Sequence, residues 1–152
     1  MENTNTADFD PLKLDNQLCF PLYACAKEVV RRYTPFLNEI DLTYTQYITM
    51  MVMWECKSLS VRELGEKLLL DSGTLTPLLK KLEAKGLVIR ERSHEDERKL
   101  NVVITEKGEA LRSRALGIPR QMGKCVDLSA EDAAELRRLL NKLIDNVRQE
   151  ER

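Results

Sequence analysis

The sequence has a single histidine and no closely spaced cysteine pair. Its four cysteines, Cys19, Cys25, Cys56 and Cys125, are widely separated. Structural zinc sites need clustered cysteine and histidine ligands. We therefore predict no metal site, and nothing in the sequence implies a cofactor. In a reducing compartment scattered cysteines are usually small buried residues, which is the expectation for Cys25 and Cys56.

Long hydrophobic runs and an excess of one charge are also missing. No apolar run is long enough to span a bilayer, and the acidic, polar N-terminus is unlike a signal peptide. We expect no membrane partner and take the cytoplasm as the default location. The formal net charge is -1, which excludes a broadly basic protein that coats nucleic acid. Any DNA binding must therefore depend on local placement of charge and must weaken with salt.

The most informative stretch runs from Ser60 to Lys99. Within it four leucines recur at helical spacing and predict one apolar stripe: Leu75, Leu78, Leu79 and Leu82. Asp71 or Ser72 can cap the start of this helix. Gly86 is placed to end it in a left-handed conformation.

The face opposite the leucines is small and hydroxylic near the helix start and basic further on. A helix in a major groove needs short side chains for close approach and lysines for phosphates. Ser72, Thr74 and Thr76 are therefore candidates for base contacts, and Lys80 and Lys81 for phosphate contacts. A plainer interpretation is open, in which Ser72 only caps the helix and the lysines are solvated.

The segments around this helix are typical of a winged helix-turn-helix. Ser60 and Glu63 form a capping box for a short preceding helix. Residues 87–92 and 100–104 alternate as two strands, which predicts a mainly α fold with a small β-wing (α+β). An ordinary α+β core with a solvated charged loop remains the alternative.

The loop between the two strands, residues 93–99, is long and charged. Arg98 is the candidate to enter a minor groove from its tip, and Asp96 is expected to pair with it and aim it. Arg90, on the first strand, is expected to meet a phosphate.

Helical patterns flank the predicted winged domain, which spans residues 41–104. Residues 14–40 and 105–150 carry apolar stripes that the winged module at Ser60 to Lys99, of about forty residues, cannot cover. We predict that these helices pack against a second copy. The homodimer would then present two recognition helices to a palindromic double-stranded operator. Packing within one chain is the alternative.

Several motifs resemble the MarR family of bacterial transcription regulators. Asp96-Glu97-Arg98, after residues 81–88, carries the general resemblance. Leu18-Cys19-Phe20, residues 42–47 and residues 70–77 are similar to the OhrR-type branch, which senses organic hydroperoxides through cysteine. The resemblance covers roughly residues 14–105, and a span of several motifs is more specific than a lone motif.

The resemblance implies that Cys19 is the redox-sensing residue and that Tyr33 and Tyr44 support its thiolate. If Pro21 marks the first helical turn, Cys19 lies at a helix N-terminus, whose dipole favours the anion. Tyr33 is about 21 Å further along an unbroken helix, so it can reach only the partner's Cys19. Cys25 is also too far along the helix to form a disulfide with Cys19.

The resemblance offers Cys125 from the other subunit as the second thiol, and a small cellular thiol is the alternative. Cys125 lies between the last two predicted helices, in residues 117–127. We expect this stretch to be movable, because Pro119 and Gly123 break helices.

These expectations describe a repressor and not an enzyme. The reduced dimer binds its operator, and oxidation of Cys19 by an organic hydroperoxide releases it. Two rivals stay open. One is a MarR-type repressor that is released by a small aromatic ligand, and the other is a thiol peroxidase that uses Cys19 catalytically.

Overall fold

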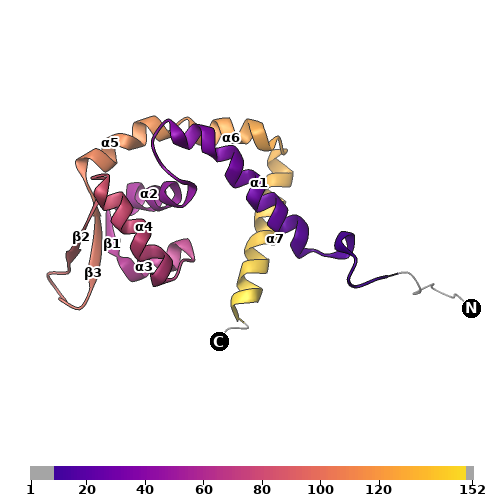
Figure 1. Ribbon diagram of the computed structural model, residues 1–152, viewed down its shortest axis with the longest axis horizontal. Helices are drawn as coiled ribbons and strands as arrows, with labels where there is room; N and C mark the ends of the chain where they lie inside the picture. The colour runs from indigo at the N-terminus through magenta and orange to yellow at the C-terminus, as the bar shows by residue number, and fades with distance from the viewer. Residues whose placement is uncertain (1–8, 150–152) are drawn as a thin grey trace, which may run out of the picture. The chain divides into compact units, whose positions relative to one another are not determined.

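The computed structural model describes residues 9–149. After a 3-10 turn (Leu14–Asn16) the described elements are α1 (Cys19–Asn38), α2 (Tyr44–Cys56), β1 (Ser58–Ser60), α3 (Val61–Leu68), α4 (Ser72–Ala84), β2 (Val88–Arg92), β3 (Leu100–Ile104), α5 (Glu106–Ala115), α6 (Ile118–Val126) and α7 (Ala130–Gln149) (Figure 1). The chain divides into two compact units, one ending at Leu116 and the other beginning at Gly117. The predicted division into a winged domain and dimerisation helices stays a prediction.

Helix α2 is the centre of the first unit. It packs against α1, α3, α4, α5 and β3. Its Met50 and Met53 are fully buried, as expected for a helix that is apolar almost all round. Methionine is a flexible gap-filler, which suits the two positions of α2 that face the core, whereas Met51 on the opposite side is 46% exposed.

Helix boundaries follow the capping signals of the sequence. The predicted Ser60–Glu63 capping box is present at α3. Asp71, and not Ser72, caps α4 by accepting the Thr74 N–H at 2.8 Å. Gly86 has a φ of 73° and ends α4 as predicted. The N–H groups of Gly86 and Leu87 then bond the carbonyls of Glu83 and Leu82 in the usual left-handed helix ending.

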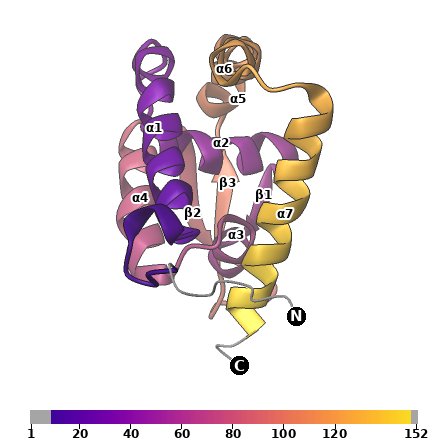
Figure 2. The same cartoon turned by 90° about the vertical axis from the view of Figure 1, so that its right-hand side faces the viewer.

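The wing is a three-stranded antiparallel sheet in which β3 lies between β1 and β2 (Figure 2). Val88 pairs with Ile104 and Arg92 with Leu100, so the two predicted strands are confirmed. The third strand, β1, was not predicted. It has only three residues, which is too short for an alternating pattern to be recognised.

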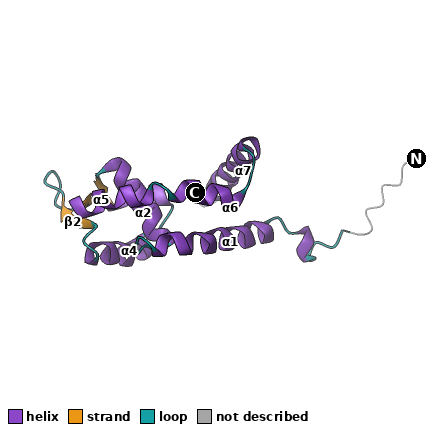
Figure 3. Ribbon diagram, turned by 90° about the horizontal axis from the view of Figure 1, so that it is seen from above, coloured by secondary structure: helices purple, strands orange, loops and turns teal. Residues whose placement is uncertain are grey.

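Helix α1 begins at Cys19 with Pro21 in its first turn, which is the condition under which Cys19 was expected at a helix N-terminus. Proline is tolerated there because the first N–H groups of a helix have no intrahelical partner. The N-terminal part of α1 extends away from α2 and α4 (Figures 1 and 3). Only Leu37 is buried among its twenty residues, and Leu18 and Tyr23 are 72% and 64% exposed.

The second unit corrects one expectation. Residues 117–127 were predicted to be a movable stretch interrupted by Pro119 and Gly123, but most of them form helix α6. Pro119 occupies its first turn, where proline is compatible with a helix. Cys125 therefore lies in the last turn of a helix and not in a loop. Helix α7 begins after Ser129, whose hydroxyl accepts the Asp132 N–H at 3.0 Å. Within residues 9–149 no helix is long and apolar enough to cross a membrane.

Candidate DNA-binding surface and redox site

The outer face of α4 carries the residues predicted to contact DNA. The four leucines of the predicted stripe are buried, at 7% exposure or less. The opposite face is solvent-exposed and contains Ser72, Thr74, Thr76, Lys80 and Lys81. Packing of the leucines therefore orients the hydroxyls and ammonium groups away from the core.

Two hydroxyls on this face already donate a hydrogen bond within the helix. Thr76 Oγ1 donates to the Ser72 carbonyl at 2.8 Å, and Thr74 Oγ1 donates to Asp71 Oδ2 at 3.3 Å. Each oxygen keeps lone pairs that can accept a hydrogen bond, and both side chains are exposed. The two threonines can therefore accept hydrogen bonds from base amino groups or cover a thymine methyl.

The cap of this helix gives a direct test of its role. Hydrogen bonds from the Thr74 and Gly73 N–H groups lower the pKa of Asp71. We expect Asp71→Ala to reduce the free energy of unfolding by about 1 kcal/mol, because one N–H loses its acceptor. Chemical denaturation measures this change. Asp71→Asn keeps the acceptor and should be nearly neutral, and equal losses in both variants would contradict a capping role.

Arg98 lies in the loop at the tip of the wing, as predicted. The predicted pairing of the Arg98 and Asp96 side chains is not formed among the described residues. Asp96 Oδ1 instead accepts the backbone N–H of Arg98 at 3.0 Å. The Asp96 carbonyl accepts the Lys99 N–H at 2.9 Å, so Asp96 organises the turn itself. The Arg98 side chain is exposed. Asp96 thus fixes the backbone from which Arg98 projects.

Arg90 forms an ion pair and a hydrogen bond with Glu83. Its guanidinium lies 2.9 Å from Glu83 Oε2, and its backbone N–H donates to Glu83 Oε1 at 3.1 Å. These bonds lower the pKa of Glu83. The pair joins the end of α4 to β2. To meet a phosphate, Arg90 must share or leave this contact.

The predicted tyrosine pair is close in space. The rings of Tyr33 and Tyr44 lie 5.0 Å apart, and Tyr47 lies 5.8 Å from Tyr33. Burial, with a further contribution from Tyr44, raises the pKa of Tyr33 above its ordinary value of 10.0. Burial raises the pKa of Tyr47 in the same way. Both hydroxyls therefore stay protonated at neutral pH and can donate hydrogen bonds.

The four cysteines are not joined by disulfides, and three of them are exposed: Cys19, Cys25 and Cys125. The expectation that Cys25 is buried was wrong for the single chain, because α1 is covered on so little of its surface. Cys56 is half-buried. Cys19 is in the first turn of α1, fourteen residues from Tyr33 on the same helix. Among the described residues no group of histidine, cysteine and acidic side chains could hold a metal ion.

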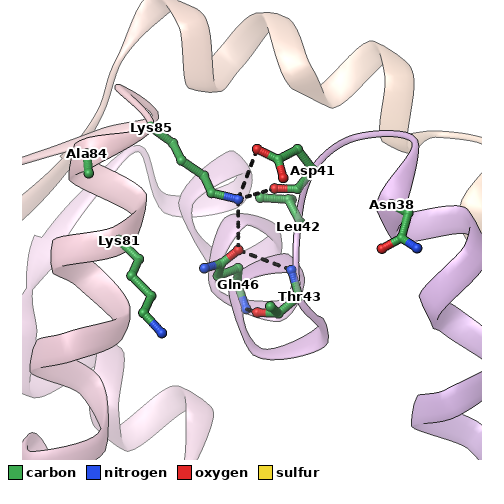
Figure 4. Close-up of a pocket in the computed structure, with 8 residues that line it drawn as sticks. All are labelled: Asn38, Asp41, Leu42, Thr43, Gln46, Lys81, Ala84 and Lys85. Atoms are coloured by element: carbon green, nitrogen blue, oxygen red, sulfur yellow. Dashed lines mark hydrogen bonds and ion pairs between the residues drawn. The ribbon is translucent and has the colours of Figure 1, made fainter.

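Two residues of interest escaped the sequence analysis. Tyr47 is a core residue at 3% exposure, and it also packs on Tyr33. Lys85 had no assigned role, although its ammonium group lies 3.2 Å from Asp41 Oδ2 and 3.4 Å from Gln46 Oε1 (Figure 4). These partners are about forty residues away in sequence, so no local pattern signals the contact.

Known proteins resemble the chain over almost its whole length. A family model described as transcriptional regulator SarA/Rot matches residues 31–114. The organic hydroperoxide resistance transcriptional regulator of Bacillus subtilis strain 168 is 43% identical over 141 residues, which cover 93% of this chain and 96% of that protein.

Two solved structures of AbfR, from Staphylococcus epidermidis, share the fold. Reduced AbfR bound to DNA is 29% identical with a TM-score of 0.77, covering 90% of this chain and 93% of that chain. Disulfide-formed AbfR is also 29% identical, with a TM-score of 0.59 and 90% of each chain covered.

The three-stranded wing, the capped helix α4 and these similarities define a winged helix-turn-helix DNA-binding regulator of transcription. The chain belongs to the MarR/SarZ family of transcriptional regulators. The predicted family and fold are thereby confirmed. Its relatives are regulators and not enzymes, which argues against the thiol peroxidase alternative.

Proposed function

We propose that this protein is a repressor that leaves its operator when an organic hydroperoxide oxidises Cys19. The observation that carries the proposal is the 5.0 Å pairing of Tyr33 with Tyr44, together with an exposed cysteine in the first turn of α1. The hydroperoxide-resistance role in the name of the Bacillus subtilis relative supports the choice of oxidant.

A homodimer is needed to complete each sensor site. Along the unbroken helix α1, Cys19 and Tyr33 of one chain are about 21 Å apart. The chain also leaves apolar side chains exposed on α1 and α7, and none of the residues of α7 is buried. Pairing of two copies through these helices would cover them and bring Cys19 of one chain to the tyrosines of the other.

The proposed chemistry requires only the oxidant and thiols. The Cys19 thiolate attacks the terminal peroxide oxygen, the O–O bond breaks, and an alcohol leaves after taking up a proton. The product is a sulfenic acid. A second thiol then attacks the sulfenic sulfur, forms a disulfide and releases water. We propose Cys125 of the partner subunit as this thiol, with a small cellular thiol as the alternative.

In the reduced state the dimer would hold a palindromic operator in the bacterial cytoplasm. Ser72, Thr74 and Thr76 would face bases in the major groove, with Lys80 and Lys81 at phosphates. Arg98 would enter the minor groove, and Arg90 would reach a phosphate beside Glu83. A disulfide formed only in the oxidised state supplies the energy difference that a population shift requires.

The test is operator binding before and after one equivalent of cumene hydroperoxide per Cys19. The operator is a duplex selected by the reduced protein from a randomised pool. We expect oxidation to weaken binding by on the order of tenfold to a hundredfold. Cys19→Ser should bind and stay bound, whereas Cys25→Ser, a matched change on the same helix, should be released like the unaltered protein.

The alternatives have separate outcomes in this experiment. Non-reducing electrophoresis should show a covalent dimer that Cys125→Ser removes, and loss of binding without this band would indicate a small thiol instead. Release of Cys19→Ser by the hydroperoxide would contradict the proposal. Unchanged binding by the unaltered protein would favour release by a small aromatic ligand.

A further inference from the structure

We infer that Lys85 is a positioning residue that couples the sensor tyrosines to the recognition helix α4. This inference rests on the proposed redox function and extends it to a residue outside both the sensor site and the DNA-binding face. The coupling element is the contact of Lys85 with Asp41 and Gln46, which we call the Lys85 latch (Figure 4).

The latch begins at the corner between α1 and α2. The Lys85 ammonium donates to the backbone carbonyl of Asp41 and lies 3.2 Å from the side-chain carboxylate of the same residue. Asp41 has a φ of 54°, in the left-handed region that aspartate adopts more readily than most residues. Lys85 thus binds both polar groups of the residue at which the chain turns from one helix toward the next.

The latch continues into the first turn of α2. Gln46 is 3% exposed, and its side-chain oxygen accepts the Thr43 N–H at 3.1 Å and lies 3.4 Å from Lys85 Nζ. Gln46 is therefore shared between the capping box of α2 and the end of α4. Tyr44 lies between Thr43 and Gln46 in this turn, and its ring packs on Tyr33. A shift of Tyr44 must move the groups that hold Lys85.

At its other end the latch is attached to a stiff part of the molecule. The Lys85 carbonyl accepts a hydrogen bond from Lys107 at 2.8 Å, and the Gly86 carbonyl accepts one from Thr105 at 2.6 Å. The residues that end α4 are thereby joined to the start of α5. A pull on Lys85 by the corner would therefore move the C-terminal end of α4 together with the start of α5, and would not be absorbed by fraying of the last turn.

The pocket beside the latch contains a natural control. It has a volume of about 620 Å³, and Lys81 lines it one helical turn before Lys85. Among the described residues no hydrogen bond or ion pair joins Lys81 to the α1–α2 corner, and Figure 4 shows its ammonium directed away from Asp41. The two lysines lie one turn apart at the end of α4 and share a charge and a pocket, but only Lys85 contacts the corner.

The experiment measures operator affinity of reduced and cumene-hydroperoxide-oxidised dimers for the unaltered protein, Lys85→Met, Lys85→Arg and Lys81→Met. In Lys85→Met we expect reduced-state affinity to fall while oxidised-state affinity is unchanged. The ratio of the two should therefore drop by about tenfold, as for loss of a charged hydrogen-bonded contact. Lys85→Arg keeps donors for the same acceptors and should keep the ratio. Lys81→Met should weaken both states equally and leave the ratio unaltered.

The ratio separates coupling from simple destabilisation, because unfolding lowers the active fraction in both states. Thermal unfolding of each variant verifies the fold, and Lys85→Gln, with an intermediate expected ratio, replaces Lys85→Met if that variant is unfolded. An unaltered ratio in Lys85→Met or Lys85→Gln would overturn the inference. A ratio of one in the unaltered protein would instead overturn the proposed redox function, and the inference with it.

Discussion

A heterodimer with Cys19→Ser in one chain and Tyr33→Phe plus Tyr44→Phe in the other is expected to oxidise its remaining Cys19 at the unaltered rate. Suppose that each sensor site takes its cysteine from one chain and its tyrosines from the other. This heterodimer then has one complete site, and its second site lacks both the cysteine and the tyrosine hydroxyls. The Tyr33–Tyr44 homodimer variant, in which no site is complete, should be slower by about tenfold or more, as for the loss of hydrogen bonds to a charged group.

The mirror-image heterodimer is the control. It combines an unaltered chain with a chain carrying all three substitutions, so that a site shared between chains is nowhere complete. We expect it to oxidise as slowly as the Tyr33–Tyr44 homodimer variant. Affinity tags of two kinds isolate each heterodimer, and mass spectrometry after trapping of the sulfenic acid measures the rate at Cys19. Fast oxidation of the mirror-image heterodimer and slow oxidation of the first would show that each site lies within one chain.

This expectation depends on tyrosine hydroxyls that remain donors. Burial raises the pKa of Tyr33 above 10.0, so its proton is held well beyond the pH at which thiols ionise. A neutral donor stabilises a thiolate by hydrogen bonding to it, whereas a tyrosinate would repel it. Within the chain the ring of Tyr44 packs on Tyr33, which makes the two tyrosines one surface for an incoming thiolate.

Much of the winged region was predictable because its signals are local. The leucine spacing of α4, the capping box of α3 and Gly86 are each contained within a few residues, and all have the predicted roles. Pro21 was informative for the same reason, since proline fits the first turn of a helix.

The features that escaped prediction depend on contacts between distant segments. Strand β1 has three residues and exists because Leu59 pairs with Val102 across the sheet. The Lys85 latch joins residues about forty positions apart. Helix α6 was missed for another reason, because Pro119 was interpreted as a break although it occupies the first turn.

The greatest loss of stability is expected from Gly108→Ala, at the first turn of α5. A Cβ at Gly108 would overlap the Leu87 carbonyl oxygen and lie 2.8 Å from Ile104 Cγ1. The carbonyl cannot yield, because it accepts the Thr105 N–H at 3.1 Å in the turn that joins the wing to α5. We expect the free energy of unfolding to fall by about 3 kcal/mol, as for overpacking against fixed backbone. Thermal unfolding at matched protein concentration should show a midpoint lower by roughly 10 °C.

A second readout identifies the cause of this loss. The Gly108 carbonyl accepts a hydrogen bond at 2.8 Å from the indole of Trp54, the single tryptophan of the sequence. Displacement of α5 should lengthen this bond and shift tryptophan emission to the red. Gly123→Ala, in α6, is the matched control, because its Cβ would have no neighbour within 4 Å and alanine favours a helix. It should unfold at or slightly above the unaltered midpoint, and equal behaviour of the two variants would show that α5 does not depend on close approach at Gly108.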